Sequence, residues 1–320
     1  MTRTPINELT DGFSIDQDFR LADKQLRVNR QGGKYLLLKL ADRSGSIIAM
    51  MWNVDDSDYE QLERGGYIRG RGRTQVHQGA LQVILSDIES LTEQDVDLED
   101  FEQFDAAASD NAIDDLRQLI DGMHDVFLRG LGQSWLADDN FVSRLKTATA
   151  AVSNHHAYPG GLLRHTLDLM QLCQFVGPRY PRVDTDLLTF GAFLHDLGKI
   201  EEISASGELT YTDRGQLVGH IVIGVQMLDA AIRRYEQESE QEFPSDLKMQ
   251  LEHLIVSHHG QLEYGSPRLP ATLEAITLHH LDNMDAKITS FTSLIESDLT
   301  NSENWTNYHP SIGRKLWKKQ

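Results

Sequence analysis

The sequence contains a single cysteine, Cys173, and no long apolar run. One cysteine excludes an internal disulfide and suits a reducing compartment, so we expect a cytoplasmic protein. A membrane-spanning helix needs about 18 consecutive apolar residues, and the chain has no such stretch. The first residues lack the basic and then apolar segments of a secretory signal, so none is expected. With 40% hydrophobic and 25% charged residues in 320 positions, the chain can build a packed core.

Basic residues are also few, because 30 Lys and Arg stand against 49 Asp and Glu, a net charge of −19. The acid is concentrated in residues 91–130, which carry 2 basic and 12 acidic residues. We interpret residues 93–110 as an acidic linker between two domains, residues 1–92 and 111–320, although solubility alone could also explain the charge. Any contact with nucleic acid therefore needs a local basic surface rather than the overall charge.

Residues 12–89 have the pattern of short strands separated by turns. Residues 35–40 and 46–52 form one predicted hairpin, and residues 67–76 and 80–88 form a second. The polar stretch 55–62 between them could form a short helix. Five strands with one helix between the third and the fourth is the plan of an OB-fold. We therefore predict a multidomain α and β protein that begins with a five-stranded OB-fold β barrel.

One predicted strand of this barrel has a regular row of polar side chains. Tyr67, Arg69, Arg71 and Arg73 recur at every second position, so they share one face of the strand. Glycines on the other face permit the bend that closes a small barrel. Three cations beside a ring suit a single-stranded nucleic acid, because the cations bind phosphates and the ring stacks on bases. These four residues are candidate substrate-binding residues, and a solvated strand edge is the alternative.

From residue 111 onward the apolar period becomes helical, and no strand alternation of comparable strength occurs. Helices are predicted at residues 112–119, 141–152, 162–176, 186–195, 218–235, 246–258 and 273–299. We therefore predict an all-α second domain. Cys173 lies on an apolar helix face and is expected in its core.

Histidine is concentrated in this second domain, where 11 of the 13 histidines lie between His155 and His309. Several of them neighbour carboxylates on different predicted helices, which is typical of a metal site built in a helical core. The candidate ligands are His165, His195, Asp196, His220, His258, His259 and Asp282. Imidazole and carboxylate without thiolate favour manganese, iron, cobalt or zinc, and so many ligands suit two six-coordinate ions that share a carboxylate.

These residues also resemble a known superfamily. Residues 191–199, with the sequence GAFLHDLGK, resemble the signature of HD-domain phosphohydrolases, and His165 and Asp282 match its separated ligands. Residues 154–166, 219–221, 257–260, 265–267 and 282–287 narrow the likeness to the YhaM family. The resemblance covers both predicted domains, roughly residues 12–300. Residues 260–263 lack the Gly-Tyr-Pro of HD-type cyclic-di-GMP phosphodiesterases, which argues against that branch.

The YhaM resemblance implies an OB-fold joined to an HD domain in a 3′–5′ exoribonuclease that acts on single-stranded RNA, with single-stranded DNA as a further candidate. The implied chemistry is activation of water by two divalent ions, Mn²⁺ first, to release nucleoside 5′-monophosphates. Asp196 would be the bridging and catalytic carboxylate. The first ion would be held by His165, His195 and Asp282, and the second by His220, His258 and His259. The resemblance leaves a homo-oligomer open, and no membrane partner is expected.

Other polar residues near the motifs are weaker candidates. Lys199 either contacts a phosphate oxygen during catalysis or is an exposed lysine beyond a helix. His155 and His156 could contact substrate, protonate the leaving 3′-oxygen or only hold their loop. Asp285 and His279 each lie three residues from the last candidate ligand, so either could hydrogen-bond to a ligand histidine.

Two other classes of function compete with the exoribonuclease. A phosphohydrolase that acts on a small nucleotide would use the same metal ligands, with the OB-fold as a regulatory module. A nucleic-acid binder without activity would have a structural metal, but such a site needs neither so many ligands nor a flanking lysine. The basic residues 314–319 either add a contact to nucleic acid or form a solvated tail.

Overall fold

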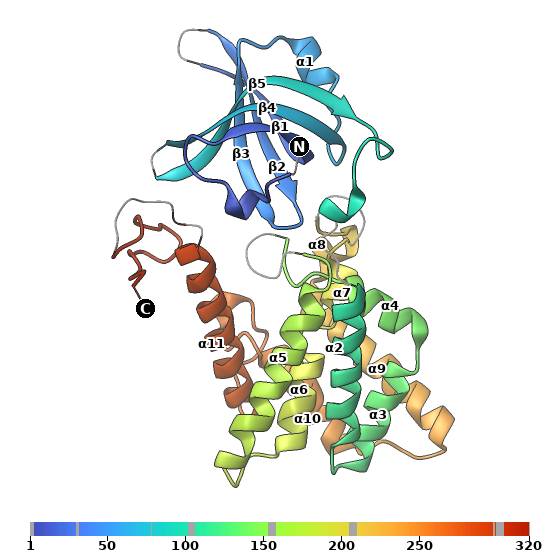
Figure 1. Cartoon of the computed structure of the whole chain (residues 1–320). Helices are drawn as coiled ribbons and strands as arrows, with labels where there is room; N and C mark the ends of the chain where they lie inside the picture. Colours follow the sequence, from blue (N-terminus) through green and yellow to red (C-terminus); the bar gives the residue numbers. More distant parts are fainter. Residues whose placement is uncertain are drawn as a thin grey trace. The chain divides into compact units, whose positions relative to one another are not determined.

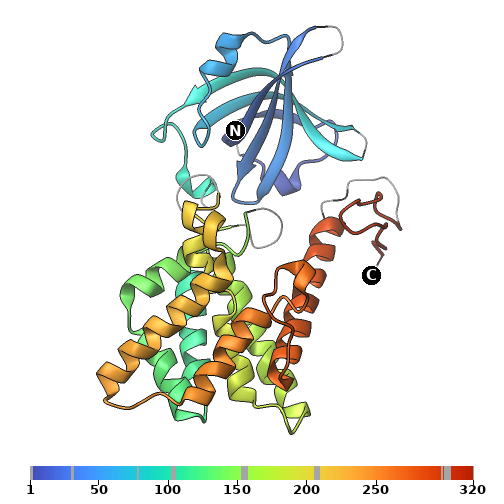
Figure 2. The same cartoon turned by 180° about the vertical axis from the view of Figure 1, so that it is seen from behind.

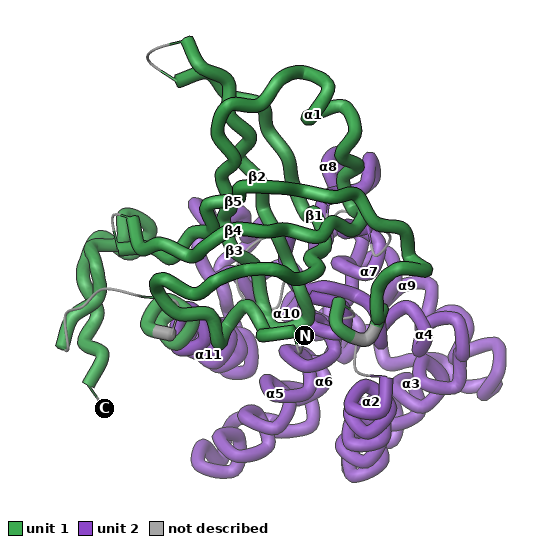
Figure 3. The backbone as a smooth tube through the Cα atoms, turned by 45° about the horizontal axis from the view of Figure 1, so that its top comes forward, with its two compact units in different colours: residues 1–103, 291–320 green, residues 104–290 purple. Residues whose placement is uncertain are grey.

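The computed structural model describes residues 3–29, 32–77, 79–101, 106–152, 158–204, 210–296, 298 and 304–319. The chain divides into two compact units, one of residues 1–103 with 291–320 and one of residues 104–290 (Figure 3). The first contains a β barrel and the second is helical, which confirms the predicted fold class. Among the described residues, no helix combines the length and the apolar character that crossing a membrane requires.

Five strands form a closed barrel (Figure 1). In barrel order they are β1 (Ser14–Val28), β2 (Lys34–Asp42), β3 (Gly45–Trp52), β5 (Ala80–Leu91) and β4 (Tyr67–His77). β3 pairs with β5 in parallel, the other pairs are antiparallel, and β4 closes the barrel on β1. Helix α1 (Asp56–Glu60) lies between β3 and β4, where the sequence predicts a short helix. This is the predicted OB-fold.

Alternation along the strands sorts the side chains of the barrel into an inner and an outer set. On β2, Leu36, Leu38 and Leu40 are buried, whereas Lys39 between them is exposed. Phe19 of β1 is fully buried in the same cluster. Each such side chain contributes about 2 kcal/mol when buried, so the inner set stabilises the barrel and the outer set is left for contacts.

A β-bulge in the ladder of β4 and β5 lies beside the glycines of the predicted strand, and Ser86 of β5 is its extra residue. The register between β4 and β5 shifts between Arg71 and Gly72. A Cβ atom on Gly72 would lie 2.1 Å from the carbonyl oxygen of Ile84. Only glycine therefore permits this close approach of two backbones, a role that adds to the bend predicted for the glycine face.

The helical unit is built around α6 (Thr185–Leu194), in which every residue from Leu187 to Leu194 is buried. A helix that is apolar on all sides must be covered on all sides. α5 (Gly161–Val176), α10 (Ser245–Ser257) and α3 (Val126–Leu136) pack against it, and α9 (His220–Ser239) lies beside α10 (Figure 1 and Figure 2). Further helices are α2 (Ala106–Asp121), α4 (Asp139–Thr147), α7 (Lys199–Glu202), α8 (Asp213–Val218) and α11 (Leu273–Glu296).

The boundaries differ from the predicted ones at both ends of the helical domain. α2 begins at Ala106, inside the stretch 93–110 predicted as a linker, because Ile113 and Leu116 bury one face of a helix whose other face carries the acid. At the other end, residues 291–320 group with the barrel and not with the predicted domain 111–320. The charge of a segment therefore did not show where its helix begins.

The sequence pattern did not predict α3. Two glycines, Gly130 and Gly132, interrupt it and lower its helix propensity. The packing explains both, because a Cβ atom on Gly130 would lie 2.8 Å from the ring of Tyr235 in α9, and one on Gly132 would lie 2.7 Å from the side chain of Ile120 in α2. Close helix packing therefore outweighs the local propensity.

We expect Gly72→Ala to destabilise the barrel, because the added methyl group overlaps the Ile84 carbonyl. The loss in free energy of unfolding should be at least about 2 kcal/mol, and thermal unfolding followed by circular dichroism would measure it. Gly224→Ala is a suitable control, since its Cβ would make only an ordinary contact at 3.4 Å and alanine favours a helix. Equal unfolding temperatures for Gly72→Ala and the wild type would contradict this account of the bulge.

Candidate metal centre

Helix ends deliver most of the candidate ligands to one buried place. His195 and Asp196 directly follow α6 and are 0% and 4% exposed. His258 follows α10 in the same way, and His220 is the first residue of α9. The other candidates are His165 on α5, His259 after α10 and Asp282 on α11. The packing of α5 and α10 against α6, and of α9 against α10, therefore brings together residues that are far apart in the sequence.

Gly198 lets α9 approach the end of α6. A Cβ atom at this position would lie 2.0 Å from the carbonyl oxygen of His220 and 2.8 Å from the backbone nitrogen of Gly224. Any larger residue would push the first turn of α9 away. The glycine two residues after Asp196 is thus a packing requirement of the centre.

The candidate ligands form two groups, and each group could hold a metal ion. The first group is His165, His195 and Asp282, and the second group is His220, His258 and His259. Within each group, one ligand atom of every residue lies within 4.8 Å of the others. These are the same two sets that the sequence analysis proposed for two ions.

Asp196 lies between the two groups and turns one carboxylate oxygen toward each. Its Oδ2 is 3.3 Å from His195 Nε2 and 3.9 Å from His165 Nε2. Its Oδ1 is 3.6 Å from both His220 Nε2 and His258 Nε2. A carboxylate placed in this way can serve an ion in each group at once.

Hydrogen bonds at Nδ1 orient the ligand imidazoles. Three of them bond to backbone carbonyl oxygens at 2.7–2.8 Å, namely His195 to Ala192, His258 to Ile255 and His259 to Tyr264. A carbonyl oxygen can only accept, so Nδ1 carries a proton and Nε2 is the ring nitrogen left for a metal ion. The backbone thus fixes the tautomer of these three histidines.

Carboxylates orient the two other imidazoles. Asp285 Oδ2 lies 3.2 Å from His165 Nδ1, which is the kind of contact predicted for Asp285. Glu202 Oε1 lies 3.1 Å from His220 Nδ1 and also accepts from the backbone nitrogen of His220 at 2.9 Å. Sequence reasoning missed Glu202, although its place six residues after Asp196 in the sequence was a signal. The structure buries Glu202, whereas its neighbour Glu201 is half-buried. Such bonds raise the basicity of a ligand histidine.

The donor atoms fit a divalent transition-metal ion. Among the described residues, the buried atoms Asp196 Oδ1, His220 Nε2 and His258 Nε2 have no hydrogen-bond partner. Leaving a polar atom buried and unpaired costs about 1–3 kcal/mol. Imidazole nitrogens together with a carboxylate oxygen are ligands that manganese, iron, cobalt and zinc accept. An ion between Asp196 and the second group would satisfy all three atoms.

The protonation states of the shared ligand and the second group suit metal binding. Burial opposes ionisation of Asp196, but Lys199 and His195 hold the pKa of its carboxyl well below the usual range. Burial and the neighbouring His195 hold the pKa of His258 well below its usual value, and burial lowers the pKa of His259. A carboxylate and two neutral imidazoles are the ligating forms at neutral pH.

The first group differs, because carboxylates surround His165. Burial alone would lower the pKa of His165, but hydrogen bonds to Asp282 and Asp285 raise this pKa to about 10. The same contact with His165 lowers the pKa of Asp282 to about 2 against the effect of burial. An ion that enters the first group must therefore displace a proton from His165.

Lys199 is not the exposed lysine that the sequence left as an alternative. It is the first residue of α7, and its Nζ lies 2.7 Å from Asp196 Oδ2. Burial would lower the pKa of Lys199, but Asp196 raises it, so the ammonium stays charged at neutral pH. A fixed positive charge therefore lies next to the proposed bridging carboxylate.

The three further histidines named by the sequence have different outcomes. His279 is buried, and its Nδ1 lies 2.9 Å from the backbone oxygen of His258. It therefore contacts the backbone of a ligand and not a ligand imidazole, because the turn after α10 passes in front of its ring. His155 and His156 fall in residues 153–157, outside the described residues, so their roles stay predictions.

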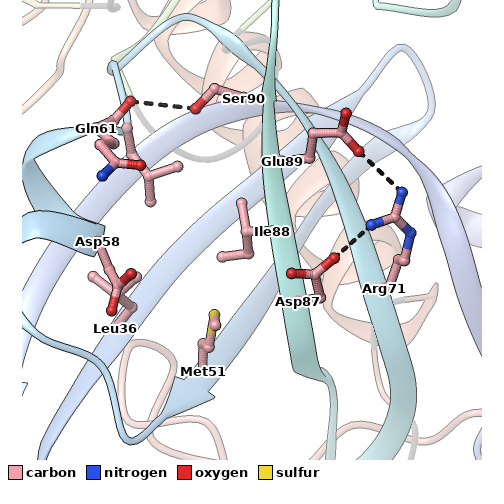
Figure 4. A pocket seen from close by; sticks show the side chains of 10 residues that line it. Leu36, Met51, Asp58, Gln61, Arg71, Asp87, Ile88, Glu89 and Ser90 are labelled. Carbon is pink, nitrogen blue, oxygen red and sulfur yellow. Dashed lines mark hydrogen bonds and ion pairs between the residues drawn. The ribbon is translucent and has the colours of Figure 1, made fainter.

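The β4 arginines share a face as predicted, but carboxylates on the neighbouring strands pair with them. Arg69 Nε lies 2.7 Å from Asp16 of β1. Arg71 bonds to Asp87 and to Glu89 of β5, the latter at 2.9 Å, beside a pocket of about 450 Å³ (Figure 4). Their predicted role in binding substrate stays a prediction, and the structure adds carboxylate partners that cannot be read from one strand.

The two other residues of the predicted row are also engaged. The ring of Tyr67 lies 5.1 Å from that of Phe101, and the Arg73 guanidinium donates to the backbone oxygen of Gly12 at 2.9 Å. A base would have to displace Phe101 to stack on Tyr67. The row can bind a nucleic acid only if these contacts are exchanged.

A different ring pair on the barrel is accessible, and sequence reasoning missed it. Tyr35 of β2 and Trp52 of β3 are cross-strand partners with ring centroids 4.8 Å apart, and Trp52 is 43% exposed. Leu37 and Met50 form the next outward pair on the same two strands. The signal was present, because the predicted hairpin of residues 35–40 and 46–52 ends with these two rings.

Both units match known families. Residues 162–287 match the family described as HD domain, a segment that contains every candidate ligand from His165 to Asp282. Residues 20–91 match the family described as OB-fold nucleic acid binding domain. The two family matches thus fall on the helical unit and on the barrel.

Two curated relatives are similar to nearly the whole chain. The protein named 3'-5' exoribonuclease YhaM of Bacillus subtilis (strain 168) is 31% identical over 286 residues, 89% of this chain and 88% of the relative. The protein of the same name from Shouchella clausii (strain KSM-K16) is 31% identical over 292 residues, 91% of this chain and 88% of the relative. A solved domain of replication protein A from Methanococcus maripaludis is 22% identical and covers 28% of this chain and 94% of that domain, with a TM-score of 0.25.

We expect Glu202→Gln to weaken metal binding in the second group, because an amide orients the His220 imidazole less firmly than a carboxylate does. The affinity of chelator-stripped protein for one of two Mn²⁺ ions should fall about 10- to 100-fold, measured by calorimetric titration. Asp285→Asn is the matched variant for the first group. Wild-type affinities for both ions in both variants would show that these carboxylates do not orient the ligands.

Proposed function

Because the chain belongs to the YhaM family, we propose that it is a metal-dependent 3′–5′ exoribonuclease that degrades single-stranded RNA to nucleoside 5′-monophosphates. The observation that carries this proposal is the position of Asp196, whose two oxygens face two groups of ligands in a buried helical core. Pairs of divalent ions that share a ligand recur in enzymes that hydrolyse phosphodiesters.

Each ligand group would hold one divalent ion, and Asp196 would be shared between them. Mn²⁺ is the first candidate, with Fe²⁺, Co²⁺ and Zn²⁺ as alternatives, because imidazole and carboxylate accept all of these ions. Once bound, the ions would supply a nucleophilic water at neutral pH and neutralise the charge that develops on the phosphoryl oxygens.

Lys199 would assist by holding the phosphate that is attacked. Its ammonium donates one hydrogen bond to Asp196, and no other described residue accepts a hydrogen bond from it. A non-bridging phosphate oxygen at this position would gain a charge-assisted hydrogen bond that is fixed before substrate arrives. His155 and His156 remain the candidates for contacting the substrate and protonating the leaving 3′-oxygen.

The barrel would hold the rest of the RNA strand on its β2–β3 face, where OB-folds bind oligonucleotides. Tyr35 and Trp52 offer rings for stacking, and the exposed Arg27 is the β1 partner of Tyr35. The paired arginines of β4 are left as secondary contacts. Base stacking does not distinguish ribose from deoxyribose, so single-stranded DNA is a further expected substrate.

We expect chelator-stripped protein to leave a 5′-labelled single-stranded RNA of about 30 nucleotides intact, a length that exceeds one OB-fold site. Restoring Mn²⁺ should produce a descending ladder on a gel and release 5′-mononucleotides. Asp196→Asn should abolish hydrolysis and keep RNA binding, because Asp196 faces both ligand groups and lies outside the barrel. Intact RNA together with hydrolysis of mononucleotides or cyclic nucleotides would instead indicate a phosphohydrolase for small nucleotides.

We expect Trp52→Ala to weaken binding of single-stranded RNA about 5- to 100-fold, the range measured when one stacking ring is removed. Arg69→Gln should change the affinity less than about 3-fold, because Arg69 is already paired with Asp16 and such surface pairs contribute little. Fluorescence anisotropy on chelator-stripped protein would measure both. A larger loss of RNA affinity for Arg69→Gln than for Trp52→Ala would instead identify the arginine row of β4 as the main binding surface.

A further inference from the structure

Residues 304–319 fold into a short hairpin, called here the Trp305–Trp317 hairpin. Trp305 and Trp317 form an antiparallel bridge, and the backbone nitrogen of Thr306 donates to the oxygen of Leu316 at 2.9 Å. Thr306 and Leu316 are 2% and 5% exposed. The basic segment that the sequence left open between a contact and a solvated tail therefore has a buried side of its own.

The hairpin has an inner and an outer face. Lys318 turns inward and pairs with Asp298 at 3.0 Å. Lys315, Trp317 and Lys319 lie two residues apart and are exposed. Two residues of extended chain span about 7 Å, so one lysine lies on each side of the Trp317 ring along the same face.

The two tryptophan rings meet on this outer face. Their centroids are 5.1 Å apart at an interplanar angle of 76°, and each residue is 47% exposed. By contrast, Trp135 is buried in the core of the helical unit. Rings that remain half exposed keep flat apolar surface on which a base can stack.

The charge of the hairpin is opposite to that of the whole chain. Residues 304–319 contain four basic and no acidic residues, whereas the chain carries −19. Within the described part of the chain, Lys315 and Lys319 take part in no ion pair, unlike Arg69 and Arg71 of the barrel. A phosphate could reach these lysines without displacing a carboxylate.

We propose that the outer face of the Trp305–Trp317 hairpin is a second binding surface for single-stranded RNA, an inference that rests on the proposed function. Trp305 and Trp317 stack on bases, and Lys315 and Lys319 contact phosphates. A nucleic acid fits this face better than a protein does, because a stable protein interface buries about 800 Å² on each partner and this face consists of four side chains.

The test measures binding of fluorescein-labelled single-stranded RNA to the full-length, chelator-stripped protein at several salt concentrations. Lys315→Ser with Lys319→Ser should weaken binding and reduce the slope of log affinity against log salt by about 1.4, since each phosphate contact contributes about 0.7. The matched control removes two exposed arginines of the helical unit, Arg179→Ser with Arg182→Ser, and should leave the slope unchanged.

A second pair of variants separates stacking from a folding defect. Trp317→Ala should weaken RNA binding about 5- to 100-fold, and Trp317→Phe, which keeps a ring, should recover most of the affinity. The proposal for the hairpin is wrong if Trp317→Ala and the double serine variant keep the wild-type RNA affinity and salt slope while the wild type hydrolyses RNA. In that case the proposed exonuclease function is unaffected. If RNA binding depends on the hairpin but the protein does not hydrolyse RNA with Mn²⁺, the proposed function is wrong and the hairpin is still a binding surface. A changed molar mass by light scattering with unchanged RNA affinity would identify a contact between copies and overturn the proposal.

Discussion

The helical unit has to compensate the charge of one buried carboxylate and to place the candidate ligands around it. Asp196 follows an apolar helix and stays ionised because Lys199 and His195 offset the cost of burying its charge. The helices that cover α6 bring the histidines with them, and Gly198 gives α9 the close approach that this needs. The apolar core and the polar centre therefore depend on the same helix packing, which stabilises the fold and also defines the positions of the ligand atoms.

Hydrogen bonds within the protein orient the ligand imidazoles. Backbone oxygens hold His195, His258 and His259, and carboxylates hold His165 and His220. A ligand whose ring is already oriented loses little conformational entropy when it binds a metal. Within the described part of the chain, Asp196 Oδ1, His220 Nε2 and His258 Nε2 are buried without a partner, a cost that an ion would remove. The hydrogen bonds at Nδ1 thus leave the Nε2 atoms as the places where a metal ion could bind.

The sequence was sufficient for the fold, because the fold depends on patterns within short segments, and the ligand set that it predicted lies in two groups in the structure. Strand alternation around Leu36 to Leu40, helical periodicity, and a histidine next to Asp196 are all local. The sequence was insufficient wherever a second segment decides the outcome. The partners of Arg69 and Arg71 come from β1 and β5, and Glu202 acquires its role only because α9 starts beside it. The contacts of His279 depend on a turn that periodicity does not describe.

An acidic chain that handles a polyanion has to limit repulsion while it binds. At physiological ionic strength, charges more than about 8 Å apart are largely screened, so the acid of residues 91–130 has little influence on a surface farther away. Pairing Arg69 with Asp16 leaves the β4 face close to neutral, and the accessible rings Tyr35 and Trp52 lie on other strands. Stacking tolerates every base, because each base has a flat π face. A strand held mainly by stacking can shift by one nucleotide without losing specific contacts, which is what stepwise removal from one end demands of a binding surface.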